Sequence, residues 1–302
     1  MQQKPRVLFI VGQTAVGKSA LALAAAQHYG GEIISADSRQ IYRQMDIGTA
    51  KPTRLERELV PHHLIDVVEP DGKYSLSMFR NDALRAIHDC VGRGIVPIVA
   101  GGTGQYLAAL LEGWTVPELP PNDALRAELE EAAVRDGAAV LHARLAVLDP
   151  VAAASILATN ARRIIRALEV CIGTGERFSA LQKKEPLTFA PTVVWLQMPT
   201  EALYARIDAR VDTMLNNGLL AEVEVLLAAG YRWGLPALSG IGYHEFKPYL
   251  AQECTLADAV QRVKFDTHAF ARGQSNWFRR FNTIIHTKPM QIEQLSSVFH
   301  PD

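Results

Sequence analysis

Cysteine is scarce in this 302-residue sequence, which contains Cys90, Cys171 and Cys254 and no C-x-x-C pair. Cysteines so few and so far apart exclude a disulfide framework and a zinc-ribbon site, and they suit a reducing compartment. No apolar run approaches the ~18 residues of a membrane-spanning helix, and no apolar leader segment follows Met1. We therefore expect a cytoplasmic protein that does not insert into membranes.

An excess of charge of either sign is also missing, because 31 basic and 32 acidic side chains give a formal net charge of −1. A chain so balanced has no general attraction to nucleic acid, so RNA binding would have to come from a local basic surface. Hydrophobic residues make up 48% and charged residues 21%, which is ordinary for a globular protein. The length allows a sizeable core, and we expect a monomer.

Strand-like runs alternate with helical segments in the first third of the chain. Arg6–Val11, Glu32–Ser35 and Ile95–Ala100 resemble strands buried in a parallel sheet. Helical patterns over Ala20–Tyr29 and Leu76–Val91 separate these runs. The alternation predicts βαβ units and an α/β fold with a parallel sheet flanked by helices. Further strand candidates are His63–Val68, Thr192–Met198 and Ile284–Ile285.

The composition changes in the middle of the chain. Three prolines in Val116–Pro121 indicate a linker, and Asn122–Thr174 is rich in Ala, Leu, Glu and Arg without a convincing strand. Strand character returns after a second proline-bounded break at Pro186–Pro191. The sequence therefore predicts a discontinuous α/β core with an inserted all-helical domain: core residues 1–118 and 187–302, insertion residues 119–186.

The segment Gly12–Ser19, GQTAVGKS, fits the P-loop pattern G-x-x-x-x-G-K-[ST] between a strand and a helix. Its glycines let backbone N–H groups turn toward phosphate oxygens, and the helix dipole favours the anion. Lys18 supplies a positive charge and Ser19 can ligate Mg²⁺. The motif predicts binding of a polyphosphate or diphosphate within a P-loop NTPase-like core, without distinguishing a nucleotide from another diphosphate.

Two further motifs follow strands at the edge where parallel sheets place their ligands. Asp37 comes just after the second strand and is either a general base or metal ligand, or a capping residue in a turn. Thr103 follows two glycines after another strand, and it either donates a hydrogen bond to a leaving oxygen or caps a tight turn.

Three arginine-rich segments have two interpretations each. Arg206 and Arg210 share one helical face, where they either clamp a diphosphate or form a solvated face with nearby aspartates. Arg162-Arg163-Ile164-Ile165-Arg166 places three arginines within five residues, which suits either RNA binding or an amphipathic helix with its arginines in water. Between Arg262 and Lys288, six basic residues face one acid and alternate with aromatics, which suits either RNA binding or an amphipathic helix. Those aromatics are Phe270, Trp277, Phe278 and Phe281.

Taken together, these motifs resemble the tRNA dimethylallyltransferase (tRNA isopentenyltransferase) family, whose members prenylate an adenine beside the anticodon. The resemblance covers nearly the whole chain. It is most specific in SADSRQIYRQMDIGTAKP at Ser35–Pro52. The other matching segments are GQTAVGKS, AGGTGQYL at Ala100–Leu107, RRIIRALEV at Arg162–Val170, RIDARVDTML at Arg206–Leu215, GIGYHEF at Gly240–Phe246 and QSNWFRR at Gln274–Arg280.

The resemblance implies a reaction and its residues. A dimethylallyl group would pass from dimethylallyl diphosphate to N6 of the adenine 3′ to the anticodon. Asp37 would take the N6 proton, and Thr103 would hydrogen-bond the bridging oxygen of the diphosphate. The diphosphate would be held with Mg²⁺ by Gly12, Thr14, Ala15, Gly17, Lys18, Ser19 and Arg210, Ser19 being the metal ligand. The tRNA would contact Asp37, Ser38, Arg39, Gln40, Arg126, Arg162, Arg163, Arg166, Gln274, Trp277 and Arg279.

The chain also departs from the family pattern. Thr159-Asn160-Ala161 stands where many relatives have a proline-bearing segment, and His268 and Gly273 stand where basic residues are usual. The last two changes remove positive charge from the expected RNA surface. The alternatives are an isopentenyltransferase acting on free AMP or ATP, a small-molecule P-loop kinase, and an RNA-binding protein with a degenerate P-loop.

Overall fold

The computed structural model describes residues 4–115, 122–281, 284–287 and 295–299. It divides into two compact units, one of Met1–Leu111 with Leu187–Asp302 and one of Glu112–Pro186. The expected linker at Val116–Pro121 and the basic residue Lys288 lie outside the described residues. No helix in the described part of the chain is long and apolar enough to cross a bilayer.

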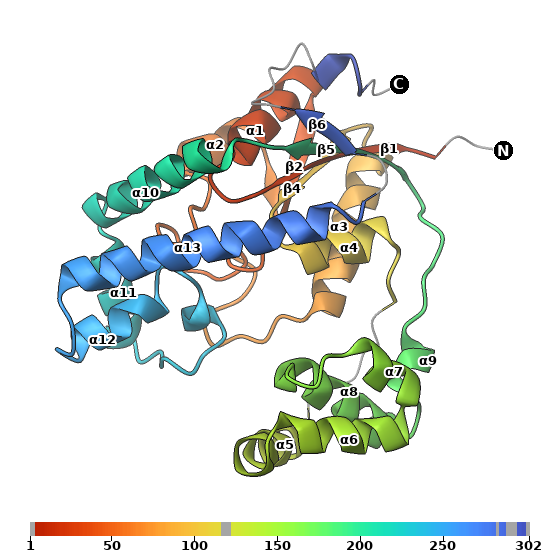
Figure 1. Ribbon diagram of the computed structural model, residues 1–302. Coiled ribbons are helices and arrows are strands. Elements are labelled where there is room, and N and C mark those ends of the chain that lie inside the picture. Colours follow the sequence, from red (N-terminus) through yellow and green to blue (C-terminus); the bar gives the residue numbers. More distant parts are fainter. Residues whose placement is uncertain (1–3, 116–121, 282–283, 288–294, 300–302) are drawn as a thin grey trace. The chain divides into compact units, whose positions relative to one another are not determined.

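The first unit is built on a parallel sheet of six strands in the order β3-β2-β4-β1-β5-β6 (Figure 1). Each neighbouring pair is parallel, and β1 runs beside both β4 and β5. The α/β class and the P-loop NTPase-like sheet expected from the sequence are confirmed. The strands are β1 (Arg6–Gly12), β2 (Gly31–Ala36), β3 (His62–His63), β4 (Val96–Gly101), β5 (Ala190–Leu196) and β6 (Ile284–Thr287).

The apolar strands are buried because helices cover the sheet. Alternate side chains Leu8 and Ile10 of β1 pack in one cluster with Leu21 and Ala25 of α1 (Lys18–Tyr29). Neighbouring Phe9 is fully buried and stacks on Phe189 at 5.8 Å between ring centroids. Burial of each such side chain contributes about 1.5–3 kcal/mol, which explains why these strands are apolar along their length.

Helices of the same unit surround the loops that leave the strands. The longest, α13 (Leu256–Phe278), begins at a capping box between Thr255 and Asp258 and packs against β1, α4 and α10 (Figure 1). Besides α1 and α13, the described part of this unit contains α2 (Arg54–Leu59), α3 (Leu76–Gly92), α4 (Gly104–Leu111), α10 (Thr200–Asn216), α11 (Leu219–Ala228), α12 (Lys247–Leu250) and two 3₁₀ turns, Ala237–Ser239 and His244–Phe246.

One strand expectation was wrong in its extent. Of the segment His63–Val68, only His63 belongs to a strand, together with His62. The chain leaves the sheet because Leu64 and Asp66 both adopt left-handed backbone conformations, with φ of 62° and 56°. Val68 then makes an isolated bridge to Tyr42 in the loop that follows β2.

One acidic side chain bonds several backbone groups of that loop. The Glu222 carboxylate on α11 accepts hydrogen bonds from the backbone N–H groups of Asp46, Ile47 and Gly48 at 2.7–3.0 Å, and from the Tyr243 hydroxyl at 2.7 Å. An added Cβ at Gly48 would lie 2.5 Å from the Tyr243 ring, so only glycine fits there. The specific MDIGTAK sequence is therefore explained by the folding of this loop.

The second unit consists of helices. These are α5 (Asp123–Asp136), α6 (Ala138–Leu148), α7 (Pro150–Ser155), α8 (Ala161–Thr174) and α9 (Phe178–Leu181). Leu129, Leu145 and Leu168 meet in its apolar core. Buried Asp149 caps α7 by accepting from Ala152 N–H at 3.0 Å, and it also accepts from Ser179 N–H and Oγ–H at 2.7 Å.

Candidate functional site

The P-loop backbone has the conformation that phosphate binding needs. Gly12 and Gly17 have φ of 154° and 106°, and Ala15 is also left-handed at 62°. An added Cβ at Gly12 would lie 2.7 Å from the Leu196 carbonyl oxygen on β5. These glycines let the loop turn sharply from β1 into the N-terminus of α1, where backbone N–H groups point outward.

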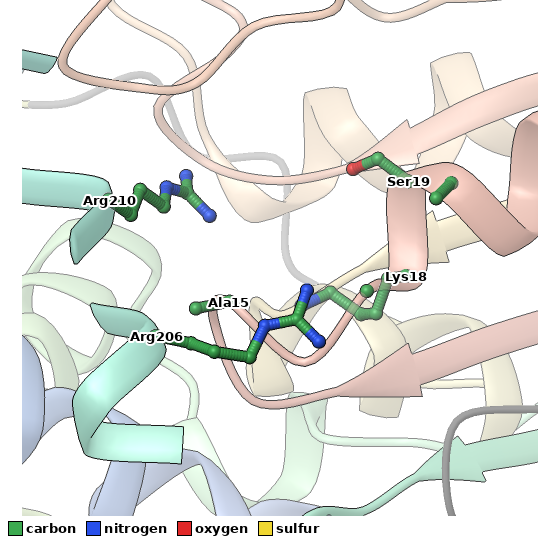
Figure 2. Close-up of a pocket in the computed structure, with 7 residues that line it drawn as sticks. Ala15, Lys18, Ser19, Arg206 and Arg210 are labelled. Carbon is green, nitrogen blue, oxygen red and sulfur yellow. The ribbon is translucent and has the colours of Figure 1, made fainter. Parts of the chain in front are cut away.

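The loop forms one wall of a pocket of about 220 Å³. Figure 2 shows the side chains of Lys18, Ser19, Arg206 and Arg210 directed into it, the two arginines coming from α10. Within the described residues, neither guanidinium has a hydrogen-bond partner, and neither does the Ser19 hydroxyl. A pocket with three cations and the N-terminus of a helix is suited to a diphosphate. The pocket is lined by Ala15, Gly17, Lys18, Ser19, Ala20, Arg206 and Arg210.

The neighbouring aspartates do not neutralise these arginines. Asp208 lies 2.9 Å from the His268 Nε2 atom on α13, and Asp212 lies 2.6 Å from the Lys264 ammonium on the same helix. One face of α10 thus pairs with α13, while the face with both arginines lines the pocket. Of the two interpretations of this segment, the pocket geometry favours the diphosphate clamp and adds Arg206 to it.

Burial destabilises the charged forms of Lys18 and Arg210 in the pocket. Burial lowers the pKa of Lys18 to about 7, the Asp37 carboxylate opposes this shift, and Arg210 adds to it. Burial likewise lowers the pKa of Arg210, again against the effect of Asp37. Lys18 donates to the carbonyl oxygen of Gln13 at 2.7 Å. A bound diphosphate would relieve the repulsion, because it supplies the negative charge that the pocket lacks.

Asp37 and Thr103 are held together at the carboxyl edge of the sheet. Strands β2 and β4 end in register at Ala36 and Gly101, and the Thr103 N–H donates to the Ala36 carbonyl at 3.2 Å. Thr103 Oγ1 accepts from Ser38 N–H at 3.0 Å and lies 3.3 Å from Ser38 Oγ. Asp37 Oδ1 accepts from the N–H of Arg39 at 2.8 Å. The Thr103 hydroxyl and the Asp37 carboxylate thus accept from successive backbone N–H groups of one turn, those of Ser38 and Arg39.

Arg39 and Gln40, which follow Asp37 and Ser38 in the sequence, have different surroundings. The Arg39 guanidinium donates to the Pro236 carbonyl and lies 3.4 Å from Ser239 Oγ. The Gln40 amide accepts from Ser35 Oγ at 2.9 Å and donates to the Ala50 carbonyl at 3.2 Å. Both side chains are partly exposed and already bonded to the protein, so a ligand would meet them in a fixed orientation.

Gln274 is not placed as the resemblance implied. Its side chain is buried, with its Oε1 atom accepting from Thr14 N–H at 2.8 Å and its Nε2 atom donating to the Gly102 carbonyl at 2.9 Å. An amide with these bonds joins the P-loop to the Gly-Gly-Thr turn and does not face a large ligand. The pattern could not show this, because its partners lie more than 170 residues away in the sequence.

Some aromatic side chains near the end of α13 are buried in the core, and others are partly exposed. Phe278 and Phe281 are buried, whereas Phe270 is 48% exposed. Trp277 packs against Gly104, and the Arg280 guanidinium lies 5.1 Å from the Trp277 ring centroid. Buried aromatics thus anchor the helix, while Arg279 and Arg280 are exposed, and RNA binding by this segment stays a prediction.

The two positions of α13 that differ from the family pattern, His268 and Gly273, have different surroundings. His268 stacks on Tyr204 with ring centroids 4.0 Å apart and faces Asp208, so it belongs to the contact with α10. Gly273 lies on the exposed side of the helix. Only the second replacement therefore affects an exposed position.

The arginines of the helical unit are placed on α5 and α8. Arg126 forms a two-pronged ion pair with the buried Glu169 carboxylate at 2.8 and 2.9 Å, and Arg166 lies 3.6 Å from the same group. Arg162 and Arg163 are exposed in the first turn of α8. The exposed pair is accessible to a ligand, while Arg126 contributes to the fold of its own unit.

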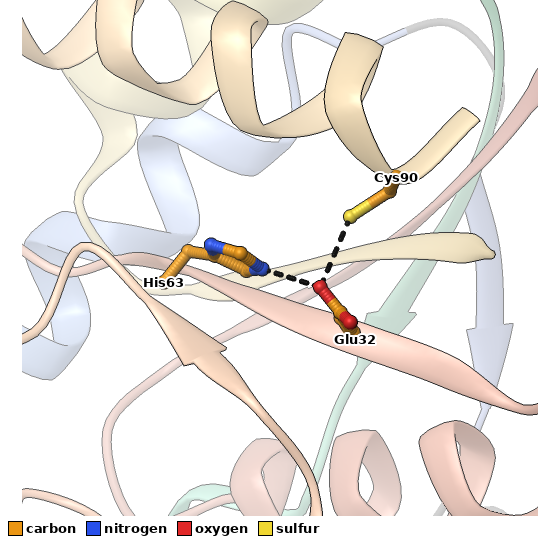
Figure 3. A group of neighbouring side chains, drawn as sticks. All are labelled: Glu32, His63 and Cys90. Carbon is orange, nitrogen blue, oxygen red and sulfur yellow. Dashed lines mark hydrogen bonds and ion pairs between the residues drawn. The ribbon is translucent and has the colours of Figure 1, made fainter. Parts of the chain in front are cut away.

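A second polar cluster lies near the start of β2 and consists of Glu32, His63 and Cys90 (Figure 3). Glu32 accepts from His63 Nε2 at 2.7 Å and from both terminal nitrogens of Arg93 at 2.7 Å. The bonds from Arg93 hold the pKa of Glu32 low, at about 2, and burial raises that of Cys90 to about 12. A fully bonded carboxylate beside a neutral thiol links β2, β3 and α3 structurally.

Fold and site together define a P-loop α/β protein with a basic pocket at the carboxyl edge of its sheet. The model of the IPP transferase family matches residues 40–281, and that of Isopentenyl transferase matches residues 5–63. A tRNA dimethylallyltransferase of Chloroflexus aggregans is 56% identical over 278 residues, covering 92% of this chain and 94% of the relative. The chain belongs to the IPP transferase family, which confirms the resemblance found in its motifs.

Other similar proteins support the same family assignment. A tRNA dimethylallyltransferase of Roseiflexus sp. is 54% identical and covers 96% of this chain and 94% of its own. The crystal structure of a tRNA isopentenylpyrophosphate transferase from Bacillus halodurans has a TM-score of 0.71 at 36% identity, covering 97% and 93%. A eukaryotic dimethylallyltransferase acting on tRNA has a TM-score of 0.81 at 30% identity, covering 97% of this chain and 76% of that one.

Proposed function

We propose that this chain transfers a dimethylallyl group from dimethylallyl diphosphate to N6 of the adenine 3′ to the anticodon in tRNA. The observation that carries the proposal is the meeting of the basic P-loop pocket with the Asp37–Thr103 pair at one edge of the sheet. The names of its relatives, tRNA dimethylallyltransferase and tRNA isopentenylpyrophosphate transferase, support it.

Asp37 is proposed as the general base. An exocyclic amine is a weak nucleophile, and its attack on C1 of the prenyl group develops positive charge on N6. A carboxylate within hydrogen-bond reach stabilises that charge and accepts the proton as the bond forms, which contributes about 10²–10⁴-fold. The bond from Arg39 N–H to Oδ1 fixes the carboxylate, so it loses little freedom when the amine arrives.

The leaving diphosphate is proposed to be held by Lys18, Arg206, Arg210 and the N–H groups of the P-loop. These groups stabilise negative charge as it accumulates on the diphosphate, and Thr103 would hydrogen-bond its bridging oxygen. The exposed Ser19 hydroxyl, at the rim of a pocket whose ligand would be an anion, fits a Mg²⁺ ligand. When bound, Mg²⁺ would neutralise part of the diphosphate charge.

The tRNA is proposed to contact partly or fully exposed groups of both units. In the core these are Ser38, Arg39, Trp277 and Arg279, and in the helical insertion Arg162 and Arg163. Exposed arginines neutralise backbone phosphates, and anticodon-loop bases unstack at lower cost than those of a duplex. Buried Gln274 and Glu169-paired Arg126 are more consistent with supporting roles than with direct contacts.

The test is transfer of radiolabelled prenyl from dimethylallyl diphosphate in the presence of Mg²⁺ and without ATP, offered to unmodified tRNA and to AMP in parallel. We expect label on tRNA and release of diphosphate in equal amounts. Label on AMP alone would establish the free-nucleotide isopentenyltransferase instead. ATP-dependent phosphorylation without prenyl transfer would establish a kinase.

A further inference from the structure

One face of α13 contacts both loops of the site. Ala271, Gln274 and Trp277 are spaced three residues apart, so they lie along one side of the helix. The Ala271 carbonyl accepts from Gln13 Nε2 at 3.0 Å, which ties the P-loop to the helix. Trp277 packs against Gly104, directly after Thr103. Gln274, between them, bonds to both loops.

The fit between helix and loops is close. An added Cβ at Gly102 would lie 2.4 Å from Gln274 Nε2, and one at Gly104 would lie 2.1 Å from Trp277 Cγ. The Trp277 ring leaves no room for a side chain at Gly104, and a Cβ at Gly102 would displace the end of the Gln274 side chain from its hydrogen bonds. Gln274 of the helix thus bridges the P-loop and the Gly-Gly-Thr turn, which follow the neighbouring strands β1 and β4.

We propose that Gln274 is a positioning residue for prenyl transfer, which rests on the function proposed above. Its carboxamide holds Thr14 of the P-loop and Gly102 of the turn at one distance. A diphosphate held by the P-loop therefore presents its bridging oxygen to the Thr103 hydroxyl. A misplacement of about 1 Å between reacting groups costs roughly 10²-fold in rate.

Two substitutions separate the two bonds. Gln274→Met removes both. Gln274→Glu keeps an acceptor for Thr14 N–H, but an ionised carboxylate also faces the Gly102 carbonyl oxygen and cannot donate to it. We expect kcat to fall by about 10²-fold in both variants. The KM for each substrate and the Kd for tRNA should stay within about twofold of wild type, because no binding contact is lost.

Acid pH should rescue Gln274→Glu and not Gln274→Met. A protonated carboxyl group donates through its O–H and accepts through its C=O, so it reproduces both bonds of the amide. The kcat of Gln274→Glu relative to wild type should therefore rise as the pH is lowered from about 9 to about 6, because protonation restores the donor to Gly102. Gln261→Glu, the same change at an exposed position of α13, should show wild-type kcat throughout.

Hydrogen exchange supplies a readout that does not depend on the reaction. The Thr14 amide should exchange faster in Gln274→Met and stay protected in Gln274→Glu, which keeps the acceptor. Wild-type kcat in folded Gln274→Met would overturn the inference, and so would weaker tRNA binding with unchanged kcat, which would make Gln274 a tRNA contact. If wild type transfers no prenyl, the proposed function fails, while the Thr14 exchange still decides whether Gln274 holds the loop.

Discussion

Replacement of Lys18 by Met should change how diphosphate binding depends on pH. Burial in the P-loop lowers the pKa of this lysine to about 7 in the free protein. A bound diphosphate places negative charge against the ammonium group and raises the pKa toward its ordinary value of about 10.4. Binding above neutral pH therefore takes up a proton at Lys18, and Lys18→Met cannot do this.

The size of the effect follows from proton linkage. Below pH 7 the ammonium is charged in both states, so its contribution to affinity is complete. Above pH 7 the free protein must first bind a proton, and the contribution falls by up to about tenfold per pH unit until the pKa of the bound state is reached. Between about pH 7 and about pH 9, the advantage of wild type over Lys18→Met should shrink roughly fifty-fold.

Isothermal titration with inorganic diphosphate at several pH values measures this advantage. The ratio of the two dissociation constants cancels the ionisation of diphosphate itself, since both proteins bind the same species. Buffers of different ionisation enthalpy count the proton taken up by wild type. A ratio that stays constant from about pH 6 to about pH 9 would refute the reasoning, because Lys18 would then be charged throughout or would not contact the diphosphate.

Four other substitutions test the remaining groups. Asp37→Asn should lower kcat by about 10²–10⁴-fold while tRNA binding survives, because only the proton acceptor is lost; undiminished turnover would remove Asp37 from the base role. Arg206→Gln and Arg210→Gln should each weaken diphosphate binding by about ten- to a hundred-fold, as expected for a charge-assisted bond, and an unchanged Kd would exclude that arginine from the clamp. Arg279→Gln should weaken tRNA binding and lower its salt slope by about 1, whereas Arg262→Gln, whose guanidinium bonds Asp266, serves as the comparison.

Local sequence patterns predicted those site residues that directly follow a strand in the sequence. Strand β1 could be predicted because a buried parallel strand is a continuous apolar run. Gly12 and Gly17 could be predicted because the turn after the strand needs glycine, and both signals lie within a few residues of one another. Asp37 and Thr103 followed from the same logic, since carboxyl ends of parallel strands share one edge. Helix α2 was not predicted, although its capping box at Thr53 and Glu56 is a readable signal.

Long-range partners could not be predicted in this way. The role of Gln274 depends on backbone atoms of Thr14 and Gly102, and a backbone partner leaves no mark on the sequence. The choice between clamp and solvated face for Arg206 depended on where the aspartates of α10 point, which the contact with α13 decides. Strand β3 was overestimated because left-handed Leu64 has none of the residue types that usually signal such a turn.

The central claim is most directly tested by identifying the modified nucleoside. An anticodon stem-loop RNA with adenine 3′ to the anticodon is incubated with dimethylallyl diphosphate and Mg²⁺, then digested to nucleosides and analysed by mass spectrometry, beside a loop with guanine at that position. The account predicts N6-dimethylallyladenosine from the adenine loop and no prenylated nucleoside from the guanine loop. Prenyl groups on both loops, or on neither while AMP is prenylated, would contradict it.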